Sequence, residues 1–398
     1  MSKGDLINAA RALFPESELS VRPRSPHDPR AMRFVPPGKG ARLAVPSSSH
    51  SAASKTIHRP SAGDSFYRSA LRGSLAVAER MRILQFVTPD GITVDHTDGS
   101  IVDHLSEVFG QQVLIGLMVG SSRANQKPVL NVFSVTGEEL GFAKVGLGAL
   151  SNRLVASEAE ALRRLSAADL KEMRVPSLIS SDPWRTHSVL VMSALRADRI
   201  QRPLSLPILA LNELGNIATS TGTAVRDSVW AGRIATECAS VGGPSPLREL
   251  VAVFLERYGD DECDLAPWHG DFGPWNMART SSVPMVWDWE RFAASMPRGM
   301  DALHFLIHRD IAGKYGSSIS PLRLNAAADH VRSLHGSSSR RRGSTSANFL
   351  LAAYLLTYAT RFVSDGLSQD VPRTTQLGLR YAEHLHRLLF ARDNLSGE

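Results

Sequence analysis

The hydrophobic pattern of this 398-residue chain changes near residue 196, and that change constrains the fold more than any other feature. Between about residues 110 and 195, short runs rich in Val, Ile, Leu and Phe alternate with turn residues, which is typical of β-strands. After residue 196, apolar residues recur mostly at the three- and four-residue spacing of amphipathic helices. We therefore expect an α+β fold with two lobes, a small β-rich lobe at 96–195 followed by a larger helical lobe at 196–398.

Each expected lobe has a definite order of elements. In the first lobe we predict a helix that stops at Gly110, a strand that ends at Gly120, a hairpin around Thr-Gly-Glu-Glu, a helix and two strands, at 100–110, 112–120, 128–146, 152–168, 175–179 and 188–195. In the second lobe we predict helices at 207–238, 245–259, 298–311, 348–363 and 377–392, a loop with a short hairpin at 268–292, and a flexible basic loop at 336–346.

Residues 1–95 carry no pattern that assigns them a chemistry, and we treat them as an N-terminal extension of unknown role. A helix is predicted within 1–20, an irregular stretch with two strand-like pieces within 22–64, and a helix running into a strand at 65–87. Residues 1–60 hold ten Lys/Arg and four Asp/Glu, which accounts for the whole net charge of +6. These charges are scattered among Pro, Ser and Gly, which favours a solvated tail over a nucleic-acid-binding one.

Composition indicates the cellular compartment and the class of protein to expect. Apolar residues make up 43% of the chain, which is enough to bury a large core without disulfide bonds. The two cysteines, Cys238 and Cys263, have no metal-site spacing. The first residues lack the apolar core of a signal peptide, and no run reaches the roughly 18 apolar residues that span a bilayer. We expect a cytoplasmic enzyme with no membrane span.

The most informative segment is His-Gly-Asp-Phe-Gly-Pro-Trp-Asn at 269–276, followed by Val-Trp-Asp-Trp-Glu at 286–290. Phosphoryl transfer from ATP requires a divalent metal held by carboxylate or amide oxygens, and a carboxylate that orients the acceptor hydroxyl and takes its proton. On a tight loop, Asp271 can face the acceptor while Asn276, five residues later, turns back to the metal. Asp288, twelve residues after Asn276, can complete the metal site from a returning strand.

This pattern resembles the catalytic motif of the aminoglycoside phosphotransferase and choline kinase family, which has a protein-kinase-like fold. The resemblance implies that Asp271 is the catalytic base and that Asn276 and Asp288 bind Mg²⁺. It also implies that His269 braces the loop and that Asp301 supports the loop without touching substrate. The letters Asp-Phe-Gly at 271–273 and His-Arg-Asp at 308–310 also spell two protein-kinase motifs, but their order is inverted and no Asn follows Asp310 at the required spacing.

The resemblance extends to the nucleotide site of the β-rich lobe. Lys144 is similar to the family's ATP-binding lysine, and Glu158 to its ion-pair partner, with Glu160 as the alternative. A loop at Gly120, Ser121 and Ser122 is expected to cover the phosphates, and the strand end at Ser193–Leu195 to pair with the adenine. The cofactors implied are ATP and Mg²⁺.

The segment between Asp288 and Asp301 is too short to hold a peptide substrate, so we expect the hydroxyl of a small molecule as acceptor, such as a sugar, an amino alcohol or an aminoglycoside-like compound. His304 and His308, four residues apart, lack a third metal ligand and are interpreted as core or surface residues. The acidic residues 256–264 are interpreted as a solvated turn. The alternative to an active enzyme is a catalytically weak, kinase-like protein that binds nucleotide or acts as a scaffold.

Overall fold

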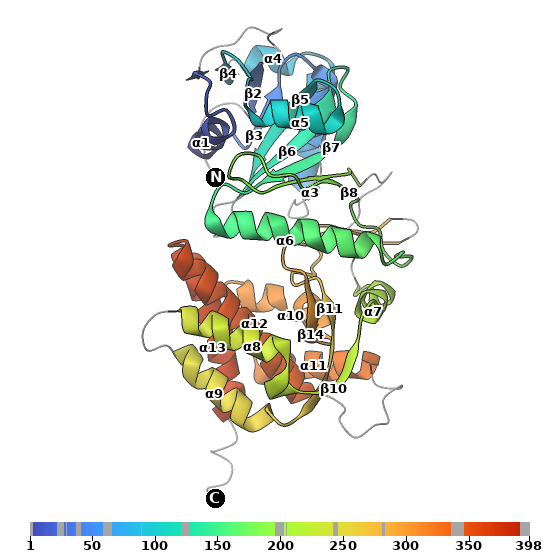
Figure 1. Ribbon diagram of the computed structural model, residues 1–398, viewed down its shortest axis with the longest axis vertical. Helices are drawn as coiled ribbons and strands as arrows, with labels where there is room; N and C mark the ends of the chain where they lie inside the picture. The colour runs from blue at the N-terminus through green and yellow to red at the C-terminus, as the bar shows by residue number, and fades with distance from the viewer. Residues whose placement is uncertain are drawn as a thin grey trace, which may run out of the picture. The chain divides into compact units, whose positions relative to one another are not determined.

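The computed structural model describes residues 3–21, 28, 30–36, 41–58, 66–88, 90–120, 127–195, 203, 205–241, 246–280, 283–335 and 346–390. The chain divides into two compact units, Met1–Ala167 with Val175–Ile200, and Ala168–Arg174 with Gln201–Glu398 (Figure 1). The first unit is built on an antiparallel sheet and the second mainly on helices, which confirms the expected α+β class. The predicted loop at 336–346 lies, apart from Ser346, outside the described residues.

In the first unit, the described residues form one nine-stranded sheet with the order β1-β4-β2-β3-β5-β6-β7-β9-β8. Its strands are β1 Leu19–Ser20, β2 Ala31–Val35, β3 Leu43–Pro46, β4 Gly91–Val94, β5 Val113–Val119, β6 Pro128–Ser134, β7 Glu139–Val145, β8 Leu178–Ser180 and β9 Val189–Met192. The helices of this unit are α1 Lys3–Leu13, α2 His50–His58, α3 Phe66–Arg80, α4 Leu84–Val87, α5 Ile101–Phe109 and α6 Ala149–Ser166.

The predicted hairpin and the elements around it are present. Strands β6 and β7 pair antiparallel about a turn in which Gly137 has a φ of +82°, a conformation that favours glycine. Helix α5 ends at Gly110, which takes the left-handed C-cap conformation expected of a stop signal. Lys144 therefore lies on β7 and Glu158 on α6, as the order of elements predicts.

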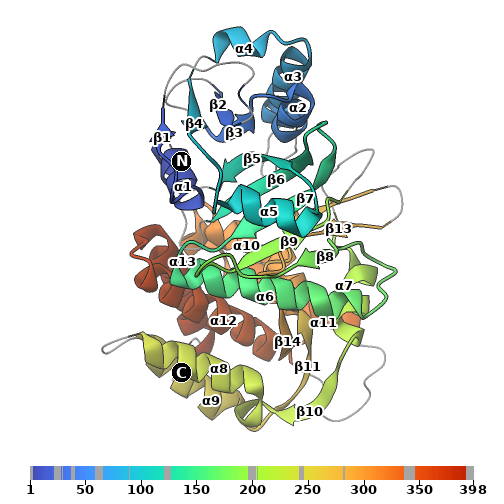
Figure 2. The ribbon, with the colours of Figure 1, turned by 45° about the horizontal axis from the view of Figure 1, so that its top comes forward.

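The N-terminal residues are more ordered than the sequence indicates. Strand β3 pairs with β5, so the sheet runs across the boundary predicted at residue 95. The stretch 22–64 also contains helix α2, which packs beside α3 (Figure 2) and buries Ala53 and Ile57. The strand predicted near residue 87 is wrong: Leu84–Val87 is a helical turn, closed by the Thr88 hydroxyl, which donates to the Leu84 carbonyl.

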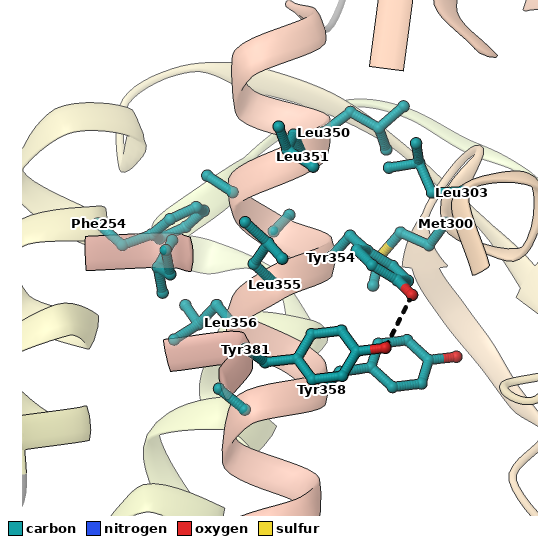
Figure 3. Packing of buried hydrophobic residues seen from close by; sticks show 14 of the residues in the cluster. Phe254, Met300, Leu303, Leu350, Leu351, Tyr354, Leu355, Leu356, Tyr358 and Tyr381 are labelled. Atoms are coloured by element: carbon teal, nitrogen blue, oxygen red, sulfur yellow. Dashed lines mark hydrogen bonds between the residues drawn. The ribbon is translucent and has the colours of Figure 1, made fainter. Parts of the chain in front are cut away.

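In the second unit, helices surround one large apolar core. The helices are α7 Ile208–Asn216, α8 Val229–Ser240, α9 Pro246–Tyr258, α10 Met300–Ala312, α11 Pro321–His335, α12 Ala347–Ser368 and α13 Pro372–Phe390, with short 3₁₀ turns at Val225–Asp227 and Gly316–Ser318. Helix α12 runs through the core and is buried on nearly every face between Phe349 and Thr360 (Figure 3). Among the described residues, no helix combines the length and the apolar character needed to cross a membrane.

The second unit also contains strands that the helical pattern conceals. Strands β10 Ser220–Ala224, β11 Glu262–Trp268 and β14 Ala293–Pro297 form a sheet in the order β10-β11-β14, and β12 Met277–Ala278 pairs with β13 Met285–Val286. The prediction that 207–238 is helical throughout is therefore wrong at β10. Pro267 lies in the central strand β11, where the register with β14 shifts between Ala266 and Trp268, because a proline cannot donate a ladder hydrogen bond.

Candidate active site

The loop that carries the motif begins where β11 ends, and its first turn requires glycine. Gly270 has a φ of +82°, and a Cβ atom there would lie 2.4 Å from the carbonyl oxygen of Arg291. The Gly270 carbonyl accepts hydrogen bonds from the Tyr358 hydroxyl at 2.8 Å and from Nη1 of Arg361 at 2.6 Å, both on α12. The turn is thus fixed by a buried helix that is distant in the sequence.

Asp301, in the first turn of α10, fixes the backbone on the other side of this turn. Its Oδ2 accepts from the His269 N–H at 2.6 Å, and its Oδ1 accepts from the Gly270 N–H at 3.0 Å. Burial raises the pKa of Asp301 to about 7, although both amide hydrogen bonds act in the opposite direction. Asp301 thus bonds two backbone amides of the loop that carries Asp271.

His269 is fully buried, and its hydrogen bonds define its tautomer. Nδ1 accepts from the backbone N–H of Asp271 at 3.1 Å, so Nε2 carries the proton and donates to the carbonyl of Trp287 at 3.0 Å. Burial lowers the pKa of His269 to about 4, which keeps the ring neutral at pH 7. His269 therefore links the Asp271 loop to the strand that returns to Asp288.

Asp271 receives three side-chain donors. Nδ2 of Asn276 donates to Oδ2 at 2.8 Å, Nε1 of Trp275 donates to Oδ2 at 3.3 Å, and Nε2 of His304 is 2.9 Å from Oδ1. Burial acts to raise the pKa of Asp271, but the hydrogen bond from His304 and the positive charge of Arg361 lower it well below the usual range. The carboxylate is thus ionised at neutral pH, with 30% of its side-chain surface still exposed.

The hairpin brings Asn276 and Asp288 to the same end of two paired strands. Met277 pairs with Val286, and the N–H of Trp287 donates to the carbonyl of Asn276 at 3.0 Å. Asp288 comes directly after Trp287, in a left-handed conformation with a φ of +69° that is rare for a residue other than glycine. Local backbone strain of this kind is typical of functional positions.

The donor set at this end of the hairpin suits Mg²⁺, which prefers hard oxygen ligands. Because Nδ2 of Asn276 donates to Asp271, its amide oxygen is the atom left for a metal. Asp288 adds a carboxylate, and a carboxylate oxygen of the buried Glu290 lies within 4.8 Å of one on Asp288. Glu290 belongs to the Val-Trp-Asp-Trp-Glu motif at 286–290, but the sequence alone assigned it no role.

In the first unit, Lys144 and Glu158 form a buried ion pair. Nζ of Lys144 donates to both carboxylate oxygens of Glu158 at 2.7 Å. The alternative partner, Glu160, is exposed and instead bonds Arg163 and Arg164 on its own helix. The structure thus pairs Lys144 with Glu158 rather than with Glu160.

The remaining predicted nucleotide contacts lie just beyond the ends of strands. Gly120 lies beyond the end of β5 and is exposed, whereas Ser121 and Ser122 lie outside the described residues. Ser193 and Leu195 come after β9, and the Ser193 N–H already donates to the Ser177 carbonyl at 2.9 Å. Adenine recognition by the Ser193 amide would require that hydrogen bond to open.

His304 was not predicted as a site residue, because the sequence pattern favours a core or surface histidine. His304 is buried, but its ring contacts Asp271. The available signal was its position three residues after Asp301, which places both side chains on one face of α10. Asp310, by contrast, is an exposed residue of α10 that bonds Arg323, so the His-Arg-Asp letters at 308–310 have no catalytic-loop geometry.

No protein-family model matches the chain, and a search of curated proteins finds no relative. Among solved structures, the chain is similar to a thermostable mutant of aminoglycoside phosphotransferase APH(4)-Ia in ternary complex with ADP and hygromycin B, with 14% identity, a TM-score of 0.47, and 72% of this chain and 98% of that chain covered.

A choline kinase from Cryptosporidium parvum Iowa II is similar at 11% identity, with a TM-score of 0.45 and coverage of 71% and 91%. A choline/ethanolamine kinase family protein from Mesorhizobium loti is similar at 15% identity, with a TM-score of 0.40 and coverage of 69% and 92%. These are the families that the motif at 269–290 resembles.

Proposed function

We propose that this protein is a Mg²⁺-dependent phosphotransferase that moves the γ-phosphate of ATP to a hydroxyl group of a small molecule. The observation that carries the proposal is the arrangement around Asp271. A single short loop holds an ionised carboxylate beside an Asn amide, and a two-stranded hairpin bonds the backbone of Trp287, the residue before Asp288, to that of the same Asn.

In this reaction Asp271 orients the acceptor hydroxyl and takes its proton as the new O–P bond forms. Phosphoryl transfer passes through a loose transition state, so positioning of the hydroxyl contributes more than strong basicity does. The low pKa of Asp271 fits this role, because the carboxylate remains ionised and ready to accept a hydrogen bond over the whole neutral range. Its partial exposure supports access for an acceptor.

Asn276 and Asp288 would hold Mg²⁺, which when bound neutralises phosphate charge and aligns the phosphoryl group. In the first unit, Lys144 would bind phosphate oxygens, because a single ammonium provides a compact positive charge. Glu158, which bonds both of its oxygens to Nζ, fixes the direction of that ammonium before nucleotide arrives. Together with Asp271, these four residues would cover the requirements of metal, phosphate and hydroxyl.

The short segment after Asp288 favours a small acceptor. A substrate peptide needs a long segment along which to bind, whereas here the chain enters β14 five residues after Asp288 and reaches Asp301 shortly after that strand. Strand β14 is itself paired with β11 within the second unit. Sugars, amino alcohols and aminoglycoside-like compounds are the acceptor classes to test.

The test is an acceptor panel with ATP and MgCl₂, measured as ADP release above the acceptor-free rate. We expect Asp271→Ala to lower kcat by about 100- to 10,000-fold, the usual contribution of a positioned acid–base group. Asp288→Ala is expected to abolish the Mg²⁺ dependence of nucleotide binding in a thermal-shift assay. Asp310→Ala, on the exposed face of α10, is the matched control and should leave both properties unchanged.

Two outcomes would contradict the proposal. Full turnover in Asp271→Ala would remove the assigned base. Binding of Mg²⁺–ATP by the wild-type chain with no transfer to any acceptor and no slow ATP hydrolysis would favour the alternative, a kinase-like nucleotide-binding or scaffold protein.

A further inference from the structure

Behind Asp271 lies an unbroken line of polar side chains from α10, α12 and α13. Nε2 of His304 meets Oδ1 of Asp271 at 2.9 Å, and Nδ1 of His304 lies 3.3 Å from the Tyr354 hydroxyl. The Tyr354 and Tyr381 hydroxyls are 3.2 Å apart (Figure 3), and Tyr381 meets Nδ1 of His308 at 2.7 Å. Five side chains are thus joined by four hydrogen bonds.

The donor in each of these bonds can be assigned from Asp271 outward. An ionised carboxylate only accepts, so Nε2 of His304 donates to it. In a neutral imidazole Nδ1 then accepts, which requires the single hydroxyl proton of Tyr354 to point at it. The Tyr354 oxygen accepts in turn from Tyr381, and the Tyr381 oxygen accepts from Nδ1–H of His308. Every proton in the line therefore points toward Asp271.

Burial keeps the imidazole of His304 and the two tyrosine hydroxyls of this line uncharged. Burial lowers the pKa of His304 from its usual value although Asp271 acts to raise it, which favours the neutral ring. Burial raises the pKa of Tyr354 well above its usual value, as it does that of Tyr381, so both hydroxyls keep their protons. The charged group nearest to this line on α12 is Arg361, which bonds the Gly270 carbonyl.

Aromatic packing holds the His304 ring in place. It stacks on Tyr358 with ring centroids 4.5 Å apart and planes inclined by 16°, and on His308 with centroids 4.3 Å apart. The hydroxyl of Tyr358 donates to Gly270, so the ring that stacks on His304 also fixes the loop that carries Asp271. His304 has no exposed surface, and two neighbouring rings pack against it.

We propose that His304 is a positioning residue that fixes the carboxylate of Asp271, and that Tyr354, Tyr381 and His308 form a buried line that fixes the tautomer of His304. The inference rests on the proposed function and deepens it. A polar line is costly in a core otherwise lined by residues such as Leu351 and Leu355, and it ends on a partly exposed carboxylate. No proton travels along the line, because Nε2 of His304 already carries one; the acceptor proton passes to Asp271 and from its exposed side to solvent.

The first experiment compares His304→Leu with His304→Gln in the full chain. The Gln amide nitrogen can replace the Nε2 donor, whereas Leu keeps volume but removes it. We expect His304→Leu to lower kcat by about 10- to 100-fold with KM for ATP within about twofold of wild type, because a misplaced catalytic group affects turnover. His304→Gln should recover at least about a third of wild-type kcat. Equal kcat in wild type and His304→Leu would overturn the inference.

The matched control is His384→Gln, on α13. His384 is also buried, but its ring bonds the carbonyl of Gly316 and not the loop. We expect this variant to lose stability without losing kcat per folded molecule. If His384→Gln lost as much kcat as His304→Leu, loss of any buried histidine of this unit would lower kcat through stability. That result would overturn the specific role of His304 in positioning Asp271.

The second experiment tests the line itself with Tyr354→Phe. In wild type the change should lower kcat by about three- to tenfold, but in the His304→Leu background by less than about twofold, because Tyr354 acts only through His304. Additive effects would overturn the role of the line.

The third measurement separates this inference from the proposed function. The ¹⁵N NMR signals of the His304 ring at pH 7 should report a neutral Nε2–H tautomer, with no substrate present. A cationic ring or the Nδ1–H tautomer would overturn the inference even in an active enzyme. A wild-type chain that phosphorylates no acceptor would instead overturn the proposed function, and the catalytic role of His304 with it.

Discussion

The Lys144–Glu158 pair and the Asp271 loop both place charged groups in buried surroundings, but the chain holds them by different means. Lys144 and Glu158 stand on a regular strand and a regular helix whose backbone hydrogen bonds are already satisfied. Asp271 stands on irregular backbone, so the amides of His269 and Gly270 need acceptors from outside the loop. Asp301 on α10 supplies them, and Tyr358 and Arg361 on α12 bind the loop carbonyl.

This difference shows what each region depends on. The ion pair depends on two opposite charges that a strand and a helix hold 2.7 Å apart. The loop depends on a set of buried polar groups from separate helices, since an unpaired buried amide or carbonyl costs as much as a lost hydrogen bond. Three substitutions test this contrast, in order of decreasing expected effect.

The largest effect is expected from Glu158→Leu. The Lys144 ammonium loses the carboxylate 2.7 Å away in a buried position, and breaking a buried pair costs about 3–5 kcal/mol of unfolding free energy. The double variant Lys144→Met/Glu158→Leu should recover most of this loss, because both charges are gone. The free energies of unfolding of wild type, Glu158→Leu and the double variant are measured by chemical denaturation. A double variant no more stable than Glu158→Leu would show that the loss does not come from breaking this charge pair.

A smaller loss, about 3 kcal/mol, is expected from Asp301→Ala. Two buried amide donors lose their acceptor at about 1–3 kcal/mol each, reduced by local relaxation. Unlike the loss in Glu158→Leu, this loss cannot be recovered by a second substitution, because the groups that lose their acceptor are two backbone amides. Asp310→Ala on the same helix is the control and should cost less than about 0.5 kcal/mol, since its pair with Arg323 is exposed. Equal losses in the two variants would show that Asp301 does not anchor the loop.

The smallest effect is a pH dependence of the free energy of unfolding that arises from His269 in the loop. Burial lowers the pKa of His269 to about 4, below its unfolded value near 6.5. The contribution of the neutral His269 ring to the free energy of unfolding is fully present above pH 6.5. It is lost as the pH falls toward 4, because in this range only the unfolded chain binds a proton at this histidine. At pH 5.5, one unit below the pKa of the unfolded chain, the free energy of unfolding is lower by about 1.4 kcal/mol.

His269→Asn keeps an oxygen near the Nδ1 position and removes the titrating group. Unfolding free energies of wild type and variant, measured between pH 7.5 and 5, should converge as the pH falls. Parallel curves would mean that His269 is not held neutral in the folded loop.

Much of the fold is encoded in local pattern. The hairpin β6–β7, the helix α5 with its stop at Gly110, and α6 were predicted because each has its own periodicity and end signals. Strands β10, β11 and β14 were missed, since β10 reads Ser-Thr-Gly-Thr-Ala and β11 contains a proline. Their pairing comes from segments far apart in the chain, which no short window of sequence contains.

The candidate site shows the same division between features set by local sequence and features set by long-range packing. The sequence by itself determined which residue types stand at Asp271, Asn276, Asp288 and Lys144 and in what order, and the proposed phosphoryl transfer uses those functional groups. Only the tertiary structure decided that Glu158 rather than Glu160 meets Lys144, and that His304 turns toward Asp271. The physical reason is that burial and hydrogen-bond partners are set by helices packed from distant parts of the chain, whereas spacing along the chain fixes only which side chains are available.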